Sequence, residues 1–288
     1  MKYNFIRDNQ DKFSITRMCQ QFNIKRNSYY AWLRRPVSNR KKEDIFLLRE
    51  IKKIYKDSHK IYGYPRVYMK LKEQGKTYGR NRIYRIMKEN GIKAKTYKKY
   101  RHKGSCINDN AAVPNILNRN FNPIEKNIAW AMDIKYLWSK AGWIYLCVCM
   151  DLFNRKIIGW CASKRAQADI VVKALNNAIK NEKPNKNVIV HSDRGSQFGS
   201  NKFKELIKQY NFRQSMSRKG NCWDNACVES FFGKMKTEHF KELSLKNEDD
   251  TRYQVFSYIE GFYNRCRIHS TLKYSVPQEY GMKQKNVA

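Results

Sequence analysis

The chain has 288 residues, with 59 Lys or Arg against 25 Asp or Glu, a formal net charge of +34 and an isoelectric point near 9.9. This excess of positive charge favours a polyanionic partner, with nucleic acid ahead of an anionic membrane surface. The sequence contains neither an apolar run of the ~20 residues that span a membrane nor the apolar core of a signal peptide. The eight cysteines form no CxxC pair, which argues against a zinc site and favours a reducing cytoplasm.

The charge is unevenly distributed along the chain. Residues 1–122 carry 31 basic and 9 acidic side chains, a net charge of +22, whereas the remainder carries 28 and 16, a net charge of +12. We therefore expect the N-terminal part to hold nucleic acid. Composition and pattern divide the chain into a helix–turn–helix segment (1–40), a second helical domain expected to bind DNA (41–103), a linker (104–122), an α/β core (123–245) and a C-terminal helical segment that completes the core (246–288).

Residues 14–34 predict two short helices around a turn. Asn23 lies where a helix–turn–helix needs a residue that tolerates positive φ, and Pro36 ends the second helix. With this charge we expect the pair to bind DNA, and a helical hairpin without a function of its own is the alternative.

The second helical domain is predicted from three amphipathic stretches. They cover residues 44–57, a helix that begins at Pro65, and residues 80–90, with glycines at the expected helix ends. The candidate DNA-contacting residues are Arg80, Arg82 and Arg85 on the last helix, and Lys98, Lys99 and Arg101 in the basic, tyrosine-containing run 93–103. A solvated charged face is the alternative for that run.

From residue 128 onward the pattern predicts an α/β domain with a mixed sheet. The expected strands are 128–138, 143–150, 157–163, 187–192 and 212–217. The expected helices are 167–182, 201–210, 224–239 and 248–266.

Three carboxylates stand out in this domain. Asp133 lies within a strand, Asp193 at the end of another, and Glu229 on a helix. Carboxylates that converge repel one another unless a cation lies between them. Oxygen ligands of this kind suit Mg²⁺ or Mn²⁺, and two such ions about 3.5–4 Å apart support phosphoryl transfer.

Three blocks around these acids, WAMDIKY, HSDRGSQF and NCWDNACVESFFGKMKTE, resemble the catalytic core of bacterial insertion-sequence transposases. The resemblance is to the OrfB-type proteins of the second reading frame, which are related to retroviral integrases. It extends to YNRCRIHSTLKYSVPQEY, to YGYPRVYMKLKEQG and to the helical pair at 14–36, and so covers essentially the whole chain.

The resemblance implies a fold and a chemistry. The fold is an RNase H-like, five-stranded mixed sheet with flanking helices, preceded by all-α helix–turn–helix units. Asp133, Asp193 and Glu229 are then the catalytic residues and hold two Mg²⁺ or Mn²⁺ ions. The resemblance also implies a circular intermediate, a homo-oligomer of two or more copies, and a partner encoded in an upstream reading frame.

The sequence therefore predicts a DNA transposase of the bacterial cytoplasm, associated with the nucleoid. It cuts at the terminal inverted repeats of its element and joins the resulting 3′-OH to target DNA. The alternatives are a non-catalytic DNA-binding regulator of its own element and a stand-alone nuclease of the same fold.

Several neighbours of the triad have weaker assignments. Lys236 follows Glu229 by seven residues, within about 20° on a helix, so it either holds a DNA phosphate or is solvated. Lys234 is about 140° away from Glu229 and is expected to be a bystander. His191 and Arg194 flank Asp193 and are candidates to support its carboxylate. For His191, contact with DNA and a satisfied strand-end histidine are the alternatives.

Asp224 and Trp223 precede the helix that carries Glu229. Five helical steps turn by about 500°, so Asp224 and Glu229 cannot face the same metals. Asp224 is therefore expected to cap the helix, and Trp223 is expected to pack in the core rather than to wedge into DNA.

Overall fold

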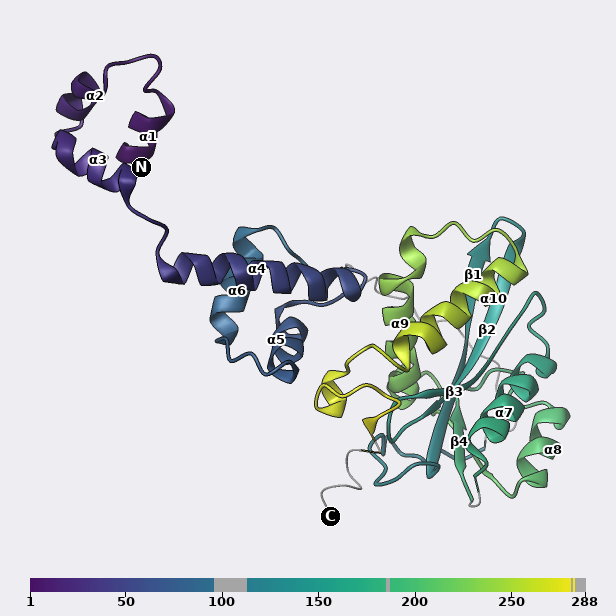
Figure 1. Ribbon diagram of the computed structural model, residues 1–288. Coiled ribbons are helices and arrows are strands. Elements are labelled where there is room, and N and C mark those ends of the chain that lie inside the picture. Colours follow the sequence, from purple (N-terminus) through teal and green to yellow (C-terminus); the bar gives the residue numbers. More distant parts are fainter. Residues whose placement is uncertain (96–112, 185–186, 281, 283–288) are drawn as a thin grey trace.

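The computed structural model describes residues 1–95, 113–184, 187–280 and 282. Two helical units precede a larger α/β core, and the first unit lies apart from the rest (Figure 1). Within the described ranges, no helix is both long and apolar enough to cross a membrane.

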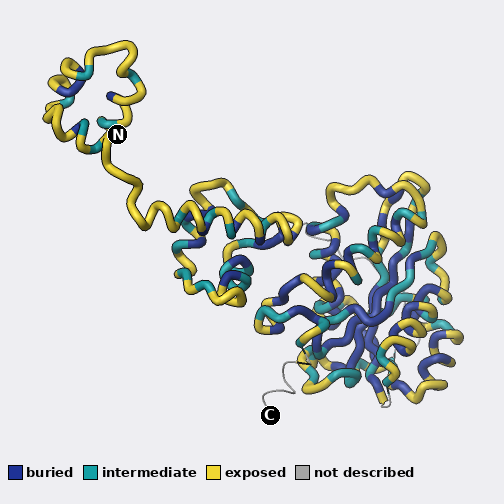
Figure 2. Tube along the Cα trace, viewed as in Figure 1, coloured by how far each residue is buried: buried dark blue, intermediate teal, exposed yellow. Residues whose placement is uncertain are grey.

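The first helical unit comprises α1 (Lys2–Asp8), α2 (Ile15–Gln21) and α3 (Arg26–Arg34). Asn23, between α2 and α3, has a φ of 53°, as the predicted turn requires. The unit has a small core of its own, built from Ile6, Met18, Cys19 and Tyr29. Exposed residues 33–40 lead from it to the second unit (Figure 2).

The second helical unit comprises α4 (Asn39–Asp57), α5 (Tyr64–Glu73) and α6 (Arg80–Glu89). Pro65 lies in the first turn of α5, and Gly75 and Gly91 follow α5 and α6 at φ values of 74° and 65°. Its buried side chains, such as those of Leu47 and Leu71, belong to the same apolar cluster as residues of the α/β core.

Tyr62 connects the second unit to the end of the chain. Its hydroxyl donates to the carbonyl oxygen of Cys266 at 2.9 Å and accepts from the backbone N–H of Ile268 at 3.0 Å. His59 also packs its ring against Phe262. The second unit is therefore docked on the C-terminal segment, whereas the first is tethered by chain alone over the described contacts.

The core is built on a five-stranded mixed sheet, as predicted. Its strands are β1 (Ala129–Ser139), β2 (Gly142–Asp151), β3 (Ile157–Ser163), β4 (Ile189–Ser192) and β5 (Arg213–Met216), in the order β3-β2-β1-β4-β5. β1, β2 and β3 are antiparallel neighbours, and β4 and β5 continue parallel to β1. This is the strand arrangement expected of an RNase H-like core.

Helices cover both faces of the sheet (Figure 1). Trp130 and Met132 of β1 pack with α7 (Ala168–Glu182) and α8 (Asn201–Gln209) on one face. Ala129 and Ala131 point to the other face, which α9 (Ala226–Glu238) covers. Because side chains alternate along a strand, Asp133 shares the α9 face. Tight packing also selects residues: a Cβ on Gly159 of β3 would lie 2.3 Å from the carbonyl oxygen of Ala174 in α7.

The C-terminal segment differs in detail from the single helix predicted over 248–266. α10 (Glu248–Phe256) continues into a π-helical stretch, Ser257–Tyr263, and a 3₁₀ turn follows at Ser270–Leu272. Tyr258, Ile259 and Phe262 of the π-helical stretch are buried in the cluster that also contains α9.

The described end of the predicted linker, residues 113–122, lies against the core. The backbone N–H groups of Ile116 and Leu117 both donate to the hydroxyl of Ser215 in β5. Leu117 is buried in the main apolar cluster. This part of the chain therefore helps to build the domain that follows it.

Candidate active site

Asp133 is a buried carboxylate with one oxygen that accepts no hydrogen bond. Its Oδ1 accepts a 2.8 Å hydrogen bond from the backbone N–H of Ile134, but its buried Oδ2 has no hydrogen-bond partner. The ammonium of Lys135 lies 3.3 Å from Oδ2 as an ion pair. Burial, with a smaller contribution from the charge of Asp193, raises the pKa of Asp133 to about 7 against the lowering effect of Lys135. An unsaturated, buried carboxylate oxygen is what a hard divalent cation requires.

Asp193 directly follows β4, the parallel neighbour of the strand that carries Asp133. The last paired residues are Ala131 of β1 and His191 of β4, and Asp133 and Asp193 each lie two residues further on. The backbone N–H of Gly195 donates to Asp193 Oδ1 at 3.0 Å and fixes its orientation. Burial raises the pKa of Asp193, while that N–H and Lys135 lower it.

Glu229 enters from the first turn of α9, on an exposed position. The start of α9 is held to the sheet because Asn225 Nδ2 donates to the carbonyl oxygen of Met132 at 3.0 Å, one residue before Asp133. All three acids affect the pKa of Lys135. Burial lowers this pKa, but Asp133, Glu229 and Asp193 together raise it above its usual value.

Only Asp133 pairs directly with Lys135, while Asp193 and Glu229 act on its charge from a longer range. Across the part of the chain that the structure describes, no three Asp, Glu, His or Cys side chains converge closely enough to hold a metal ion. The donor set is made entirely of carboxylate oxygen atoms, and Asp133 Oδ2 is free of hydrogen bonds, so these residues fit Mg²⁺ or Mn²⁺.

Asp224 is not the helix cap that the sequence predicted. The N-cap position of α9 is Asn225, and the fully buried Asp224 lies in the preceding 3₁₀ turn, Cys222–Asn225. Its oxygen atoms accept from the guanidinium groups of Arg218 at 2.7 and 2.9 Å and of Arg119 at 2.8 Å. The side chain of Asn115 adds a bond at 3.0 Å. Asp224 ties the predicted linker to the loop before α9.

Trp223 was also assigned wrongly, since its side chain is 68% exposed rather than packed in the core. The turn that buries Asp224 directs the neighbouring indole outward. Lys236 is exposed in the last turn of α9, as either of its two interpretations requires.

His191 and Arg194 are engaged in structure around β4 and β5. The two ring nitrogens of His191 lie 2.9 Å from the hydroxyl of Ser215 and 3.2 Å from that of Ser217. Burial lowers the pKa of His191 to about 4, so its ring is neutral at pH 7. Arg194 Nε donates to the carbonyl oxygen of Ser217 at 2.8 Å. These contacts favour the interpretation of His191 as a satisfied strand-end residue.

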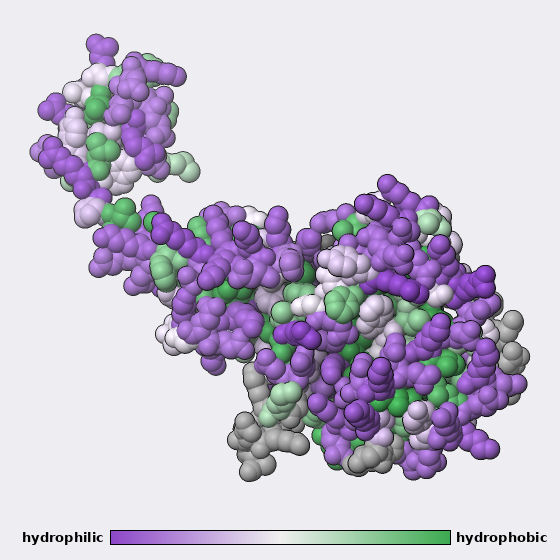
Figure 3. Space-filling view, turned by 45° about the vertical axis from the view of Figure 1, so that its right-hand side comes forward, coloured by the Kyte–Doolittle hydropathy of each residue, from purple (hydrophilic) through white to green (hydrophobic). Residues whose placement is uncertain are grey.

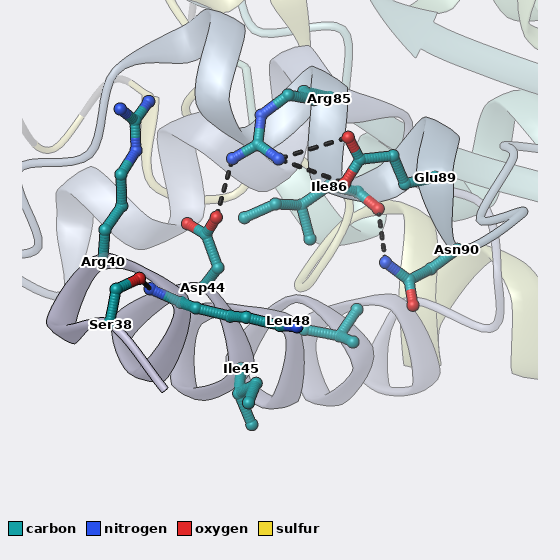
Figure 4. Close-up of a pocket in the computed structure, with 10 residues that line it drawn as sticks. Ser38, Arg40, Asp44, Ile45, Leu48, Arg85, Ile86, Glu89 and Asn90 are labelled. Carbon is teal, nitrogen blue, oxygen red and sulfur yellow. Dashed lines mark hydrogen bonds and ion pairs between the residues drawn. The ribbon is translucent and has the colours of Figure 1, made fainter. Parts of the chain in front are cut away.

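The candidate DNA-contacting arginines of α6 face acidic side chains. Arg82 pairs with Asp44 at 2.6 Å, and Arg85 bridges Asp44 and Glu89 beside a pocket between α4 and α6 (Figure 4). Arg80 instead lies over the ring of Tyr68, 5.2 Å from its centroid. Lys98, Lys99 and Arg101 fall outside the described residues.

Two residues of the site were not singled out from the sequence. Lys135 follows Asp133 by two positions in a strand, so alternation alone places both on one face. Asn225 had no such signal, because its partner, the Met132 carbonyl, is 93 residues away in sequence.

Comparison with known proteins identifies the family. An HTH-like domain family model matches residues 41–100, and two integrase core domain models match residues 124–222 and 210–277. Transposase InsF for insertion sequence IS3A of Escherichia coli (strain K12) is 36% identical over 290 residues, covering all of both chains. An uncharacterized 31 kDa protein of insertion element IS600 from Shigella sonnei is 35% identical and covers 94% of this chain and 100% of its own.

Solved structures give a more distant likeness. The HTLV-2 integrase catalytic core domain, solved in complex with magnesium, is 18% identical with a TM-score of 0.43, covering 55% of this chain and 98% of its own. A simian T-cell lymphotropic virus intasome chain reaches a TM-score of 0.48 at 14% identity, covering 80% of this chain and 74% of its own. Full-length identity to InsF and the matching domains confirm the resemblance: the chain belongs to the IS3 family of insertion-sequence transposases, with an HTH-like domain and an integrase-type core.

Proposed function

We propose that the protein cuts the ends of an insertion element and joins the resulting 3′-OH to DNA, with Asp133, Asp193 and Glu229 as its metal-binding catalytic residues. The observation that carries this proposal is the buried Asp133 Oδ2, which has no hydrogen-bond partner and feels the added negative charge of Asp193. The Lys135 ammonium, 3.3 Å away, offsets only part of the cost of burying this carboxylate, and a purely structural acid would be saturated with donors.

Asp133, Asp193 and Glu229 would hold Mg²⁺ or Mn²⁺, two ions in this proposal. Such ions, when bound, activate the attacking oxygen and stabilise the leaving oxygen of a phosphodiester. The chain's own residues prepare the site. The N–H of Gly195 orients Asp193, and the bond from Asn225 to Met132 sets the start of α9 against β1. Lys135 offsets part of the repulsion among the acids.

The DNA would be held mainly by the N-terminal part of the chain, where the net charge of +22 resides. The face shown in Figure 3 is predominantly hydrophilic over both helical units and much of the core, as an extended nucleic-acid surface requires. In this proposal Arg80, Arg82, Arg85, Lys98, Lys99 and Arg101 contact duplex DNA, and Lys236 holds a phosphate beside the acids. Contact by Arg82 and Arg85 would open their ion pairs with Asp44.

The remaining partners follow from holding two element ends at once. We propose a homo-oligomer of two or more copies that acts on terminal inverted repeats and target DNA at the nucleoid of a bacterial cell. A product of an upstream reading frame is included in the proposal as a further partner.

Glu229→Gln tests the proposal because it preserves size and removes one charged ligand. The matched control is Glu205→Gln, on an exposed position of α8. Parent and both variants are incubated with labelled end DNA in Mg²⁺, in Mn²⁺ and in EDTA. We expect cleavage and joining to disappear in Glu229→Gln and in EDTA, while DNA binding persists and Glu205→Gln behaves like the parent.

Activity in EDTA, or equal activity of Glu229→Gln and the parent, would refute metal-dependent catalysis by these acids. A parent that binds end DNA and never cuts it, even with the upstream-frame product supplied, would identify a regulator instead.

A further inference from the structure

A group of cations gathers where α5, α9 and the C-terminal segment meet, away from the three acids. We call it the junction cluster: Arg66 of α5, Arg155 of the β2–β3 turn, Lys234 of α9 and Arg267 of the C-terminal segment. Lys234 follows Glu229 by five residues on α9, about 140° around the helix, so the cluster lies on a different side of α9 from Glu229.

Arg267 is the most deeply buried member, with 1% of its side chain exposed. Its Nε and Nη2 donate to the two oxygen atoms of Glu238 at 2.7 and 2.6 Å, and the hydroxyl of Tyr258 donates to the same carboxylate at 2.8 Å. The remaining nitrogen, Nη1, is buried without a hydrogen-bond partner. A buried guanidinium N–H without an acceptor is costly, so an acceptor at this nitrogen would stabilise the folded chain.

Lys234 is joined to the cluster through His269. The ammonium lies 3.4 Å from His269 Nε2, which can only accept from it, so the imidazole is neutral there. His269 Nδ1 contacts the hydroxyl of Thr271 at 2.5 Å, and its ring lies 6.4 Å from that of Tyr263, over which Arg267 packs. Burial, Lys234 and Arg267 lower the pKa of His269 to about 3.

Arg66 and Arg155 complete the cluster from two other elements. Arg66 lies over the ring of Tyr62, whose hydroxyl bonds the backbone on both sides of Arg267. Arg155 is buried and donates to Asn122 at 2.9 Å and to the sulfur of Cys227 in α9 at 2.8 Å.

The positive charge of the junction cluster exceeds the negative charge around it. The charged groups that act most strongly on Lys234 are Arg267, Arg66 and Arg155, all cations, and the single carboxylate of Glu238. Burial and these guanidinium groups lower the pKa of Lys234 to about 8. Glu238 already receives three hydrogen bonds. Four half-buried or buried cations against one saturated carboxylate leave uncompensated positive charge and one donor without an acceptor, which an anion would satisfy.

We propose that the junction cluster binds a phosphate group, with the Lys234 ammonium and Arg267 Nη1 as donors and Arg66 and Arg155 as flanking charges. Guanidinium and ammonium groups together are the side chains that best match a tetrahedral phosphate. The ligand is either a free phosphate or a phosphodiester of DNA. The second source rests on the proposed DNA binding, and it would join the HTH-like domain to the core through one phosphate.

Thermal unfolding of the full chain, with inorganic phosphate replacing chloride at equal ionic strength and pH 7, tests the site. We expect a saturable rise in Tm of roughly 5 °C at a hundred times the dissociation constant. Lys234→Met removes one like charge, so it should raise Tm in chloride and abolish the phosphate response. Lys208→Met, at an exposed position on α8, is the control and should keep the parent's response.

The salt dependence of duplex DNA binding separates the two sources. If the ligand is a DNA phosphate, Lys234→Met lowers the log–log salt slope by about 0.9, and if it is free phosphate the slope stays unchanged. A parent without a saturable phosphate response, or Lys234→Met responding like the parent, overturns the proposal. Neither readout requires DNA cleavage, so failure of the catalytic proposal would leave this test intact.

Discussion

Asp133 and Asp224 are two buried aspartates of the core with different surroundings. They are brought near each other by the hydrogen bond from Asn225, which follows Asp224, to the carbonyl oxygen of Met132, which precedes Asp133. Asp224 is saturated: two arginines and an asparagine donate to its oxygen atoms. Asp133 has one backbone donor, one ion pair and one oxygen without a hydrogen bond.

This difference distinguishes an acid that stabilises the fold from an acid that is available to bind a metal ion. Donors that saturate a carboxylate stabilise its charge in the folded state and leave it nothing further to bind. A buried carboxylate without them is a local cost to stability, which the ion pair with Lys135 offsets in part and a bound metal ion would offset further. Replacing each acid by its neutral amide should therefore have opposite consequences.

The largest expected effect is on catalysis by Asp133→Asn. Removing a charged metal ligand should reduce strand cleavage and joining by on the order of 10³-fold or more, because several kcal/mol of transition-state stabilisation disappear. Tm in EDTA should stay equal or rise, since a poorly solvated charge has been removed. Labelled end DNA and thermal unfolding measure the two effects, with Asp169→Asn on the surface of α7 as the control. Activity within tenfold of the parent would contradict this role.

Asp224→Asn should lower the stability of the protein and leave its catalytic activity measurable. The amide keeps the shape but loses charge-assisted bonds to Arg218 and Arg119, which we expect to cost about 1–3 kcal/mol of unfolding free energy. The lower end is favoured because both arginines are about half exposed and water screens them. Chemical denaturation measures the cost, and cleavage by the folded fraction should remain measurable. Loss of activity with unchanged stability would make Asp224 a catalytic residue instead.

The pH dependence of that cost sharpens the comparison. Hydrogen bonds from the Arg218 side chain, chiefly, hold the pKa of Asp224 well below its usual range, although burial opposes them. A depressed folded pKa contributes stability that is present above the unfolded pKa of about 3.9 and is lost as the pH falls toward the folded pKa. The Tm difference between parent and Asp224→Asn should therefore be constant from pH 8 to 5 and narrow below about pH 4. A difference that widens in acid would refute this.

The smallest expected effect is that of Lys236, which tests whether the proposed active site extends from Glu229 to the last turn of α9. Lys236→Ala should weaken strand transfer by roughly tenfold, about 1.4 kcal/mol, if Lys236 holds a phosphate there. Stability should change by less than about 0.5 kcal/mol, because the side chain is exposed. Lys204→Ala on α8 serves as the control. Equal percentage losses in activity and in folded protein would favour a structural lysine.

The sequence predicted the elements whose local pattern is strong. β3 was placed at residues 157–163 because the run IIGWCAS follows the turn DLFNRK. The alternation in β1 also placed Asp133 and Met132 on opposite faces of the sheet. In the structure, α9 covers the face of Asp133. Integrase-type blocks along the chain predicted the family, and full-length relatives confirm it.

What the sequence could not predict depends on contacts between distant segments. Arg119 reaches Asp224 across 105 positions, from a segment that composition alone assigned to a linker. The same contact explains Trp223: once Asp224 is buried, the preceding side chain points into solvent. The helix α1 was missed because it is short and polar and buries only Ile6. The convergence of Glu229 with the two aspartates is still a prediction.

The bonds of Tyr62 have a consequence for the order in which the chain acquires its structure. Their partners, Cys266 and Ile268, are 204 and 206 positions further along. Docking of the second helical unit therefore closes one of the longest loops in the protein, and such distant pairings form late in folding. On the ribosome, α4–α6 cannot form these two bonds until residues 266–268 have been synthesised. A copy that ends before Cys266 would keep its HTH-like domain without them.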